Sequence, residues 1–336
     1  MPVIKGGLKL SKNSSVIHKT SVGGQALIEG IMMQGPKGAA MSVRLPDGTI
    51  DTEEKEFRHI RDKVKFLGFP VIRGCVNFVE SMIFGYKCLM ESAEKSGFEE
   101  IENSEENQSK LDKWLSEHLS KKVMSVITGV ASVLGVLLAF ALFFFLPSKI
   151  TDFFNNLASG ALTNFRALIE GIMRMIIFIA YIALVSLMKD IKRTFMYHGA
   201  EHKTIFCYEH GLELTVENVR KQSRFHPRCG TSFMFVMIII SVIISSIISV
   251  AFPYLRNNIA VWMIIKLLIL PLVMGFGYEF IKYAGRHDNT LVKILSAPGL
   301  WMQRLTTKEP DDSMIEVGIA AFKAVITDNP EDDAIR

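Results

Sequence analysis

Two histidines and a glutamate form the sequence feature best suited to chemistry. His198, Glu201 and His202 follow the pattern H-x-x-E-H, in a segment that we expect to continue a preceding apolar helix into a polar loop. Histidines four residues apart lie on one face of a helix, so both imidazoles can reach one metal ion. The adjacent carboxylate can then orient or deprotonate a bound water, as in inverted zinc peptidases. The pattern predicts a metal site; the competing interpretation is a polar helix surface at a membrane boundary.

Three further residues are candidates to complete the ligand set. His226 and Cys229 precede the third apolar run of the chain, and Glu279 lies near the end of the fourth. If these ends share one membrane depth, one or two of the three side chains complete a tetrahedral site, for which nitrogen and sulfur ligands favour zinc. A site that used both His226 and Cys229 would be closed and structural. A carboxylate as third ligand would leave room for a water activated by Glu201, and the sequence leaves both possibilities open.

These residues must be positioned by an unusually apolar chain. Of its 336 residues, 49% are hydrophobic although 21% are charged, so the apolar residues must be concentrated. They form four runs that reach the roughly 20 residues a helix needs to cross a bilayer. The runs are residues 123–146, 167–188, 231–252 and 259–280. We therefore predict a mainly α-helical, polytopic membrane protein with four transmembrane helices.

The distribution of basic residues predicts the orientation of these helices. The loop at 189–230 is rich in lysine and arginine, whereas the other two connecting loops hold only Lys149, Arg166 and Arg256. By the positive-inside rule we expect a multi-pass protein of the cell membrane with both termini cytoplasmic. The first twenty residues lack the apolar stretch of a signal peptide, so insertion through the internal helices is expected. A net charge of +4 gives no reason to expect a nucleic-acid partner.

The segments outside the runs carry structural signals of their own. Residues 41–56 predict a β-hairpin around the turn Pro46-Asp47-Gly48, and residues 66–93 predict an amphipathic helix. Ser313 and Glu316 have the spacing of a capping box ahead of a last short helix. The expected organisation is a cytoplasmic or interfacial amino-terminal region (1–95), an acidic linker (96–112), a transmembrane domain (113–288) with the basic loop 189–230, and cytoplasmic carboxy-terminal helices (289–336).

Charged residues also fall inside the apolar runs. Glu170 and Arg174 are one helical turn apart in the second run, so we expect them to pair. Lys266 in the fourth run is expected to extend its amine towards the outer membrane surface. Intramembrane charges can also mark a transport pathway, but two of the four runs carry no charge, which leaves little to line one.

Four segments resemble a known family. They are residues 23–36, 197–205 (YHGAEHKTI), 226–233 (HPRCGTSF) and 297–310 (APGLWMQRLTTKEP). Together they are similar to the YqhQ-like family of bacterial multi-pass membrane proteins of unknown function, often labelled predicted metal-dependent enzymes. The similarity covers roughly residues 20–327. It implies that the two histidines of the first pattern, Glu201, His226 and Cys229 belong to a pattern that the family shares.

Two functions remain open from the sequence. The first is a zinc-dependent membrane hydrolase that acts on a substrate at the cytoplasmic membrane face, with Glu201 as its general base. The alternative is a non-enzymatic membrane scaffold or biogenesis factor that docks a cytoplasmic or membrane protein through the large regions outside the spans. The sequence does not indicate an oligomeric state.

Overall fold

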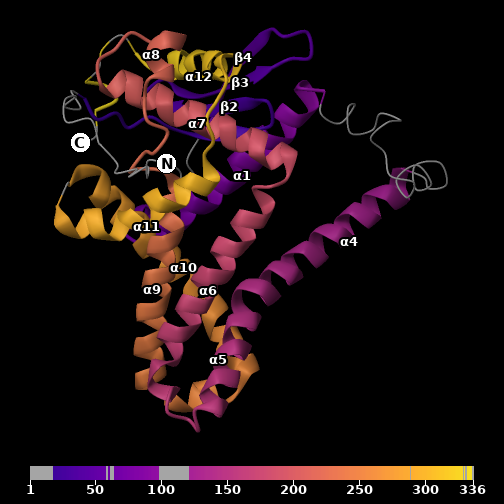
Figure 1. Ribbon diagram of the computed structural model, residues 1–336, viewed down its shortest axis with the longest axis vertical. Helices are drawn as coiled ribbons and strands as arrows, with labels where there is room; N and C mark the ends of the chain where they lie inside the picture. The colour runs from indigo at the N-terminus through magenta and orange to yellow at the C-terminus, as the bar shows by residue number, and fades with distance from the viewer. Residues whose placement is uncertain are drawn as a thin grey trace, which may run out of the picture.

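The chain folds into a helical bundle that carries a small head built around a β-sheet (Figure 1). The computed structural model describes residues 18–57, 60, 64–97, 121–287, 289–327, 329 and 331–334. Most of the expected acidic linker at 96–112 lies outside these residues. The sheet and the helices around it occupy one end of the molecule, and the long apolar helices extend away from it (Figure 1).

Four long apolar stretches make up the bundle. They are α4 (Lys121–Phe140) continued by the π-helical turn η3 (Ala141–Phe145) and α5 (Leu146–Leu157), then α6 (Arg166–Val185), α9 (Gly230–Ala251) and α10 (Ile259–Arg286). Four helical stretches of the described chain are long and apolar enough to cross a membrane. This confirms the prediction of a mainly helical fold with four such helices. The first extends past residue 146 to Leu157 because Pro147 stands in the first turn of α5, where a missing amide costs little.

The helix that carries the H-x-x-E-H pattern is separate from the second apolar helix. Helix α6 ends at Val185, and α7 (Lys189–Glu209) begins after a short break. Ser186 turns its hydroxyl back to the carbonyl of Ala183, and Met188 adopts an extended backbone that cannot continue a helix. The prediction that one continuous helix runs from the membrane into the site is therefore wrong, and α7 is free to lie against the sheet.

The amino-terminal segment forms a four-stranded antiparallel sheet in the order β1-β2-β3-β4. Its third hairpin confirms the one predicted at 41–56, with Gly48 in the turn at a φ of +86° that favours glycine. The glycine-rich apolar segment before it forms another pair of strands, for which no hairpin was predicted. The strands are β1 (Gly23–Leu27), β2 (Gly30–Gly35), β3 (Gly38–Arg44) and β4 (Ile50–Lys55).

Both faces of this sheet are covered. Ile31 and Met33 pack into a core shared with α7 and α12 (Asp312–Val325). Met32 and Met41, on the opposite face, pack around Cys88 of α1 (Ile72–Lys95). Since successive side chains of a strand point to opposite faces, a strand buried on both sides reads as a continuous apolar run.

Two helices join the head to the bundle. Helix α1, which confirms the helix predicted over 66–93, crosses α10 where Gly74 meets Gly275; a Cβ on Gly74 would lie 3.0 Å from the Cα of Gly275. Two small residues thus allow the backbones to approach closely. Helix α11 (Thr290–Thr306) packs against α9. The short elements are η2 (Lys65–Gly68), η4 (Thr163–Phe165), α8 (Val216–Arg220) and η5 (Pro253–Asn257).

The last helix begins differently from the capping box that the sequence suggested. Asp311 is the residue at the start of α12, and its carboxylate accepts hydrogen bonds from the amide of Met314 at 3.0 Å and the hydroxyl of Ser313. Glu316 is bound by Arg44 of β3 instead. An aspartate two residues before the serine offers the stronger cap, because it brings a negative charge to the positive end of the helix.

The charged residues inside the bundle form a buried network. Lys266 is 3% exposed and donates to Glu170, which also accepts from Ser148 at 2.9 Å and from Arg166. Arg174 instead donates to the Phe143 carbonyl of the π-helical turn at 3.0 Å. The expected Glu170–Arg174 pair and the expected extension of Lys266 to the surface are both corrected, because the two opposite charges meet across facing helices.

Candidate metal centre

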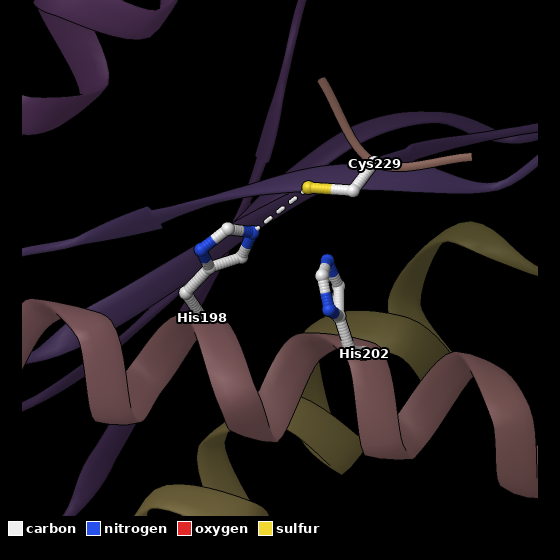
Figure 2. A group of neighbouring side chains, drawn as sticks. All are labelled: His198, His202 and Cys229. Atoms are coloured by element: carbon white, nitrogen blue, oxygen red, sulfur yellow. Dashed lines mark hydrogen bonds between the residues drawn. The ribbon is translucent and has the colours of Figure 1, made fainter. Parts of the chain in front are cut away.

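Three side chains from two distant segments converge on one point. His198 and His202 project from the same face of α7 towards Cys229, in the loop that leads into α9 (Figure 2). Their candidate ligand atoms all lie within 4.8 Å of one another, and His198 Nε2 is 3.2 Å from Cys229 Sγ. Tetrahedral bonds to zinc of about 2.05 Å for nitrogen and about 2.3 Å for sulfur separate the two ligand atoms by about 3.5 Å. The three groups therefore need only small shifts to bind one ion.

Backbone carbonyls fix the tautomers of both histidines. The Nδ1 atom of His198 lies 2.8 Å from the carbonyl oxygen of Thr306, and that of His202 lies 2.6 Å from the carbonyl oxygen of Arg224. A carbonyl oxygen can only accept, so Nδ1 carries the proton in each ring, and burial lowers the pKa of His202, which favours its neutral form. In its neutral form each ring directs the lone pair of Nε2 at the cluster. Metal-binding histidines usually donate their other ring N–H to a carbonyl or carboxylate in this way.

Glu201 lies beside the cluster with an unsatisfied carboxylate oxygen. Its side chain is buried against β1, where the amide of Gly24 donates to it, and a Cβ on Gly24 would come within 3.2 Å of Oε1. Oε2 is buried and has no hydrogen-bond partner among the described residues. An unpaired buried carboxylate oxygen is costly. Two imidazoles, a thiol and this oxygen fit a small cation such as zinc and the water it would bind.

Burial raises the pKa of Glu201 to about 7, while His198 opposes this rise and the Cys229 thiol adds to it. The folded protein therefore holds this proton more tightly than the unfolded chain, whose carboxyl has a pKa of 4.5. The contribution of Glu201 to the stability of the metal-free protein should therefore fall by about 3 kcal/mol as the pH rises from about 4.5 to about 7, and then level off.

A comparison of the wild type with Glu201→Gln isolates this effect. The unfolding free energy of both proteins is measured as a function of pH in the presence of a chelator, and the difference between them is the contribution of Glu201. The comparison is needed because burial lowers the pKa of His202 and His226 and so gives the opposite slope in both proteins. A difference that stays constant from pH 4.5 to pH 7 would contradict the prediction.

His226 lies next to the cluster but serves another contact. Its ring centroid is 5.7 Å from that of His202, while its Nε2 is 3.4 Å from the carboxylate of Glu209. Its Nδ1 accepts from the amide of Arg228, so Nε2 is the protonated atom that faces Glu209. Arg228 also donates to Glu209. The predicted ligand His226 is thus held in a separate buried network with Glu209 and Arg228.

Glu279 is also outside the cluster. Both of its carboxylate oxygens bind the guanidinium of Arg73 on α1, at 2.7 and 2.6 Å. Sequence reasoning placed Glu279 at the correct end of α10 but had no means of anticipating α1 beside it. Of the predicted site residues, the structure brings together His198, His202 and Cys229, with Glu201 against them.

One glutamine holds the loop that carries Cys229. The side chain of Gln303 accepts from the amide of His226 and donates to its carbonyl, both at 2.7 Å. We expect Gln303→Leu to leave these buried groups unpaired, loosen the loop and weaken zinc binding about 10- to 100-fold with every candidate ligand intact. Competition with a chromophoric chelator measures this affinity, with Gln222→Leu as the matched control because Gln222 bonds His210 instead. Equal weakening in both variants would contradict a specific role for Gln303.

Besides the Arg224 carbonyl, sequence reasoning missed three contributors, Gln303, Thr306 and Gly24. All three lie within segments quoted for the family resemblance, which meet around the cluster from β1, α7, the 226–229 loop and the end of α11. The segments of α7 and residue 308 also pack closely, since a Cβ on Gly199 would collide with the carbonyl oxygen of Lys308. Membership of a quoted segment was the available signal, but the residue types alone did not indicate a role.

Fold and cluster together define a class of protein: four apolar helices long enough to span a membrane, and a small sheet-containing head that buries a His-His-Cys cluster. The chain belongs to the family described as "Protein of unknown function (DUF1385)", which matches residues 69–328. It is 34% identical over 313 residues to the uncharacterized protein YqhQ of Bacillus subtilis (strain 168), across 92% of this chain and 94% of that protein. No solved structure matches it. The resemblance seen in the sequence is therefore confirmed at the level of the family.

Proposed function

We propose that the protein is a zinc-dependent hydrolase of the membrane surface, with His198, His202 and Cys229 as zinc ligands. The observation that carries this proposal is the fixed tautomer of both histidines, which leaves two Nε2 lone pairs aimed at one thiol. Two histidines that only pack in a core do not need a backbone carbonyl at each Nδ1 and a thiol near both Nε2 atoms. Two nitrogens and one sulfur are a ligand set that zinc prefers.

The number of ligands favours a catalytic over a structural zinc. Structural sites use four protein ligands, whereas catalytic sites use three and keep the fourth position for water or substrate. His226, the nearest candidate for a fourth ligand, directs its protonated nitrogen at Glu209. In the part of the chain that the structure describes, the candidate metal cluster has three members, whose ligand atoms lie within 4.8 Å of one another.

In this proposal each residue has a defined task. The carbonyls of Thr306 and Arg224 orient the two imidazoles, and bound zinc would lower the pKa of a water in the open position. Glu201 would accept the proton of that water at Oε2, while the Gly24 amide holds its other oxygen.

We also propose that the head faces the cytoplasm. The basic segment 189–230 lies in the head, whereas the loops at 158–165 and 252–258 lie at the opposite end of the bundle (Figure 1). A membrane-impermeant thiol reagent on intact cells should label Ala161→Cys but not Leu212→Cys. Labelling of Leu212→Cys in intact cells would contradict this orientation.

Glu201→Gln tests catalysis apart from metal binding. The variant is expected to keep its zinc but lose zinc-dependent turnover by at least about 100-fold, since general-base catalysis contributes about 10²- to 10⁴-fold. The probes are p-nitrophenyl esters of short and long acyl chains and bis(p-nitrophenyl) phosphate, offered to the full-length protein in detergent. Undiminished turnover in Glu201→Gln, or none by the zinc-loaded wild type with any probe, would contradict a hydrolase.

A scaffold remains the second candidate because of one exposed apolar face. Val79, Met82, Ile83, Tyr86 and Met90 lie along one side of α1 at helical spacing and are 44–62% exposed. Such a stripe suits a partner surface. For a scaffold, Met82→Ser with Tyr86→Ser should abolish crosslinking to protein partners while Glu201→Gln has no effect. The opposite pattern supports the enzyme.

A further inference from the structure

A cavity of about 430 Å³ lies directly beside the candidate metal centre. Its walls come from residues 20–23, the 227–229 loop and the end of α10 that faces the head, together with Val236 of α9, Ser296 of α11 and Ala334. Cys229 is the one residue of the His-His-Cys cluster that lines it. The cavity and the cluster therefore share a wall.

The polar part of the cavity is basic. Arg228, Lys282 and Arg286 line it, and none of its lining residues is a carboxylate. The carboxylate of Glu209, behind the wall, is bound by Arg228. Lys282 and Arg286 are one turn apart on α10, so both can reach a single anionic group, and phosphate is an anion that lysine and arginine side chains bind.

The remaining wall is apolar and leads into the membrane-spanning part. Val236 of α9 and Phe280 and Ile281 of α10 line the cavity. Lys282 and Arg286 follow directly at the end of the apolar stretch of α10, where basic residues mark the boundary between hydrocarbon and cytoplasm. A ligand in this cavity thus meets cations at one end and apolar side chains at the other.

We propose that this cavity binds an amphiphile with a phosphate headgroup, drawn from the surrounding bilayer. The phosphate lies between Lys282 and Arg286, and the acyl chain follows Val236 and Phe280 along the bundle. Binding itself does not require zinc. The further step, that this lipid is the substrate, rests on the proposed function. Cys229 belongs to both the cavity wall and the metal centre, so the headgroup of a bound lipid would lie next to the metal.

Binding is tested on the full-length protein in detergent by native mass spectrometry with phosphatidylglycerol, phosphatidylcholine of the same chains, and glycerol 3-phosphate. We expect phosphatidylglycerol to bind best. Lys282→Ala with Arg286→Ala should weaken its binding about tenfold or more, since the double variant removes both charged donors to the phosphate. Lys293→Ala, which removes an exposed cation of α11 outside the cavity, should not. Ala284→Trp fills the cavity without a change of charge and should also weaken binding.

Several outcomes would overturn the proposal. Equal affinity for the two lipids, or equal losses in the Lys293→Ala control, would mean that the cavity does not select the headgroup. Displacement of lipid by glycerol 3-phosphate at similar concentration would mean a water-soluble phosphate ligand. A variant with both His198 and His202 changed to alanine should still bind the lipid, so a failure of the zinc proposal is seen separately from a failure of this one.

Discussion

Replacing His198 and His202 together with alanine is expected to reduce bound zinc from about one ion per chain to a background level. The two substitutions remove both imidazole lone pairs and leave Cys229 as the remaining member of the cluster. Even the loss of a supporting contact to a ligand costs about 10- to 100-fold in affinity, and the loss of two ligands costs more. Elemental analysis of the purified protein, with zinc present during growth, measures the change.

The matched control is His287→Ala. His287 is an exposed histidine at the end of α10 that stacks on Tyr283, away from the cluster. It should leave zinc content unchanged, which excludes adventitious binding to surface histidines. Zinc that persists in the double variant, or that falls equally in the control, would contradict the assignment of the two ligands.

Replacing Lys266 with methionine is expected to destabilise the bundle by about 3–5 kcal/mol. Lys266 of α10 and Glu170 of α6 are both buried, and the Lys266 amine donates a hydrogen bond to the Glu170 carboxylate. Removing one partner leaves a buried charge with less compensation, and removal of one member of a buried pair is far more costly than replacement of both. The unfolding free energy in mixed micelles, obtained by titration with a denaturing detergent, reports the loss.

The double variant Glu170→Gln with Lys266→Met is the internal control. It should recover much of the stability lost in Lys266→Met, because no unpaired carboxylate remains and Arg166 keeps its ion pair with Asp152. Its zinc content should equal that of the wild type, since the pair lies outside the head. A single variant as stable as the wild type would contradict the structural role of the pair.

The sequence predicted the chemical members of the site better than their partners. Histidines at i and i+4 share a helix face wherever the helix lies, so His198 and His202 were predictable from spacing alone. Cys229 was predictable from its position before an apolar helix. Hydropathy gives the depth of a residue in the membrane but not the direction in which it points, which is why Glu279 was expected in the cluster although it binds Arg73.

The fold was predicted in outline, and each error has a physical cause. A turn of Pro46-Asp47-Gly48 identified one hairpin, but β1 and β2 lack the alternation of a half-buried strand because α1 covers one face of the sheet and α7 and α12 the other. The break between α6 and α7 depends on the backbone of Met188, which no residue type dictates. Likewise, local spacing pairs Glu170 with Arg174, whereas the folded bundle supplies Lys266.

X-ray absorption at the zinc edge of the purified, zinc-loaded protein tests the central claim most directly, because it counts the ligand atoms by element. A zinc bound by His198, His202 and Cys229 should show one sulfur at about 2.3 Å, and two imidazole nitrogens plus one further oxygen or nitrogen at about 2.0–2.1 Å. Cys229→Ser should remove the sulfur shell and keep both imidazoles. A spectrum without sulfur, or with two or more sulfurs, would contradict this site.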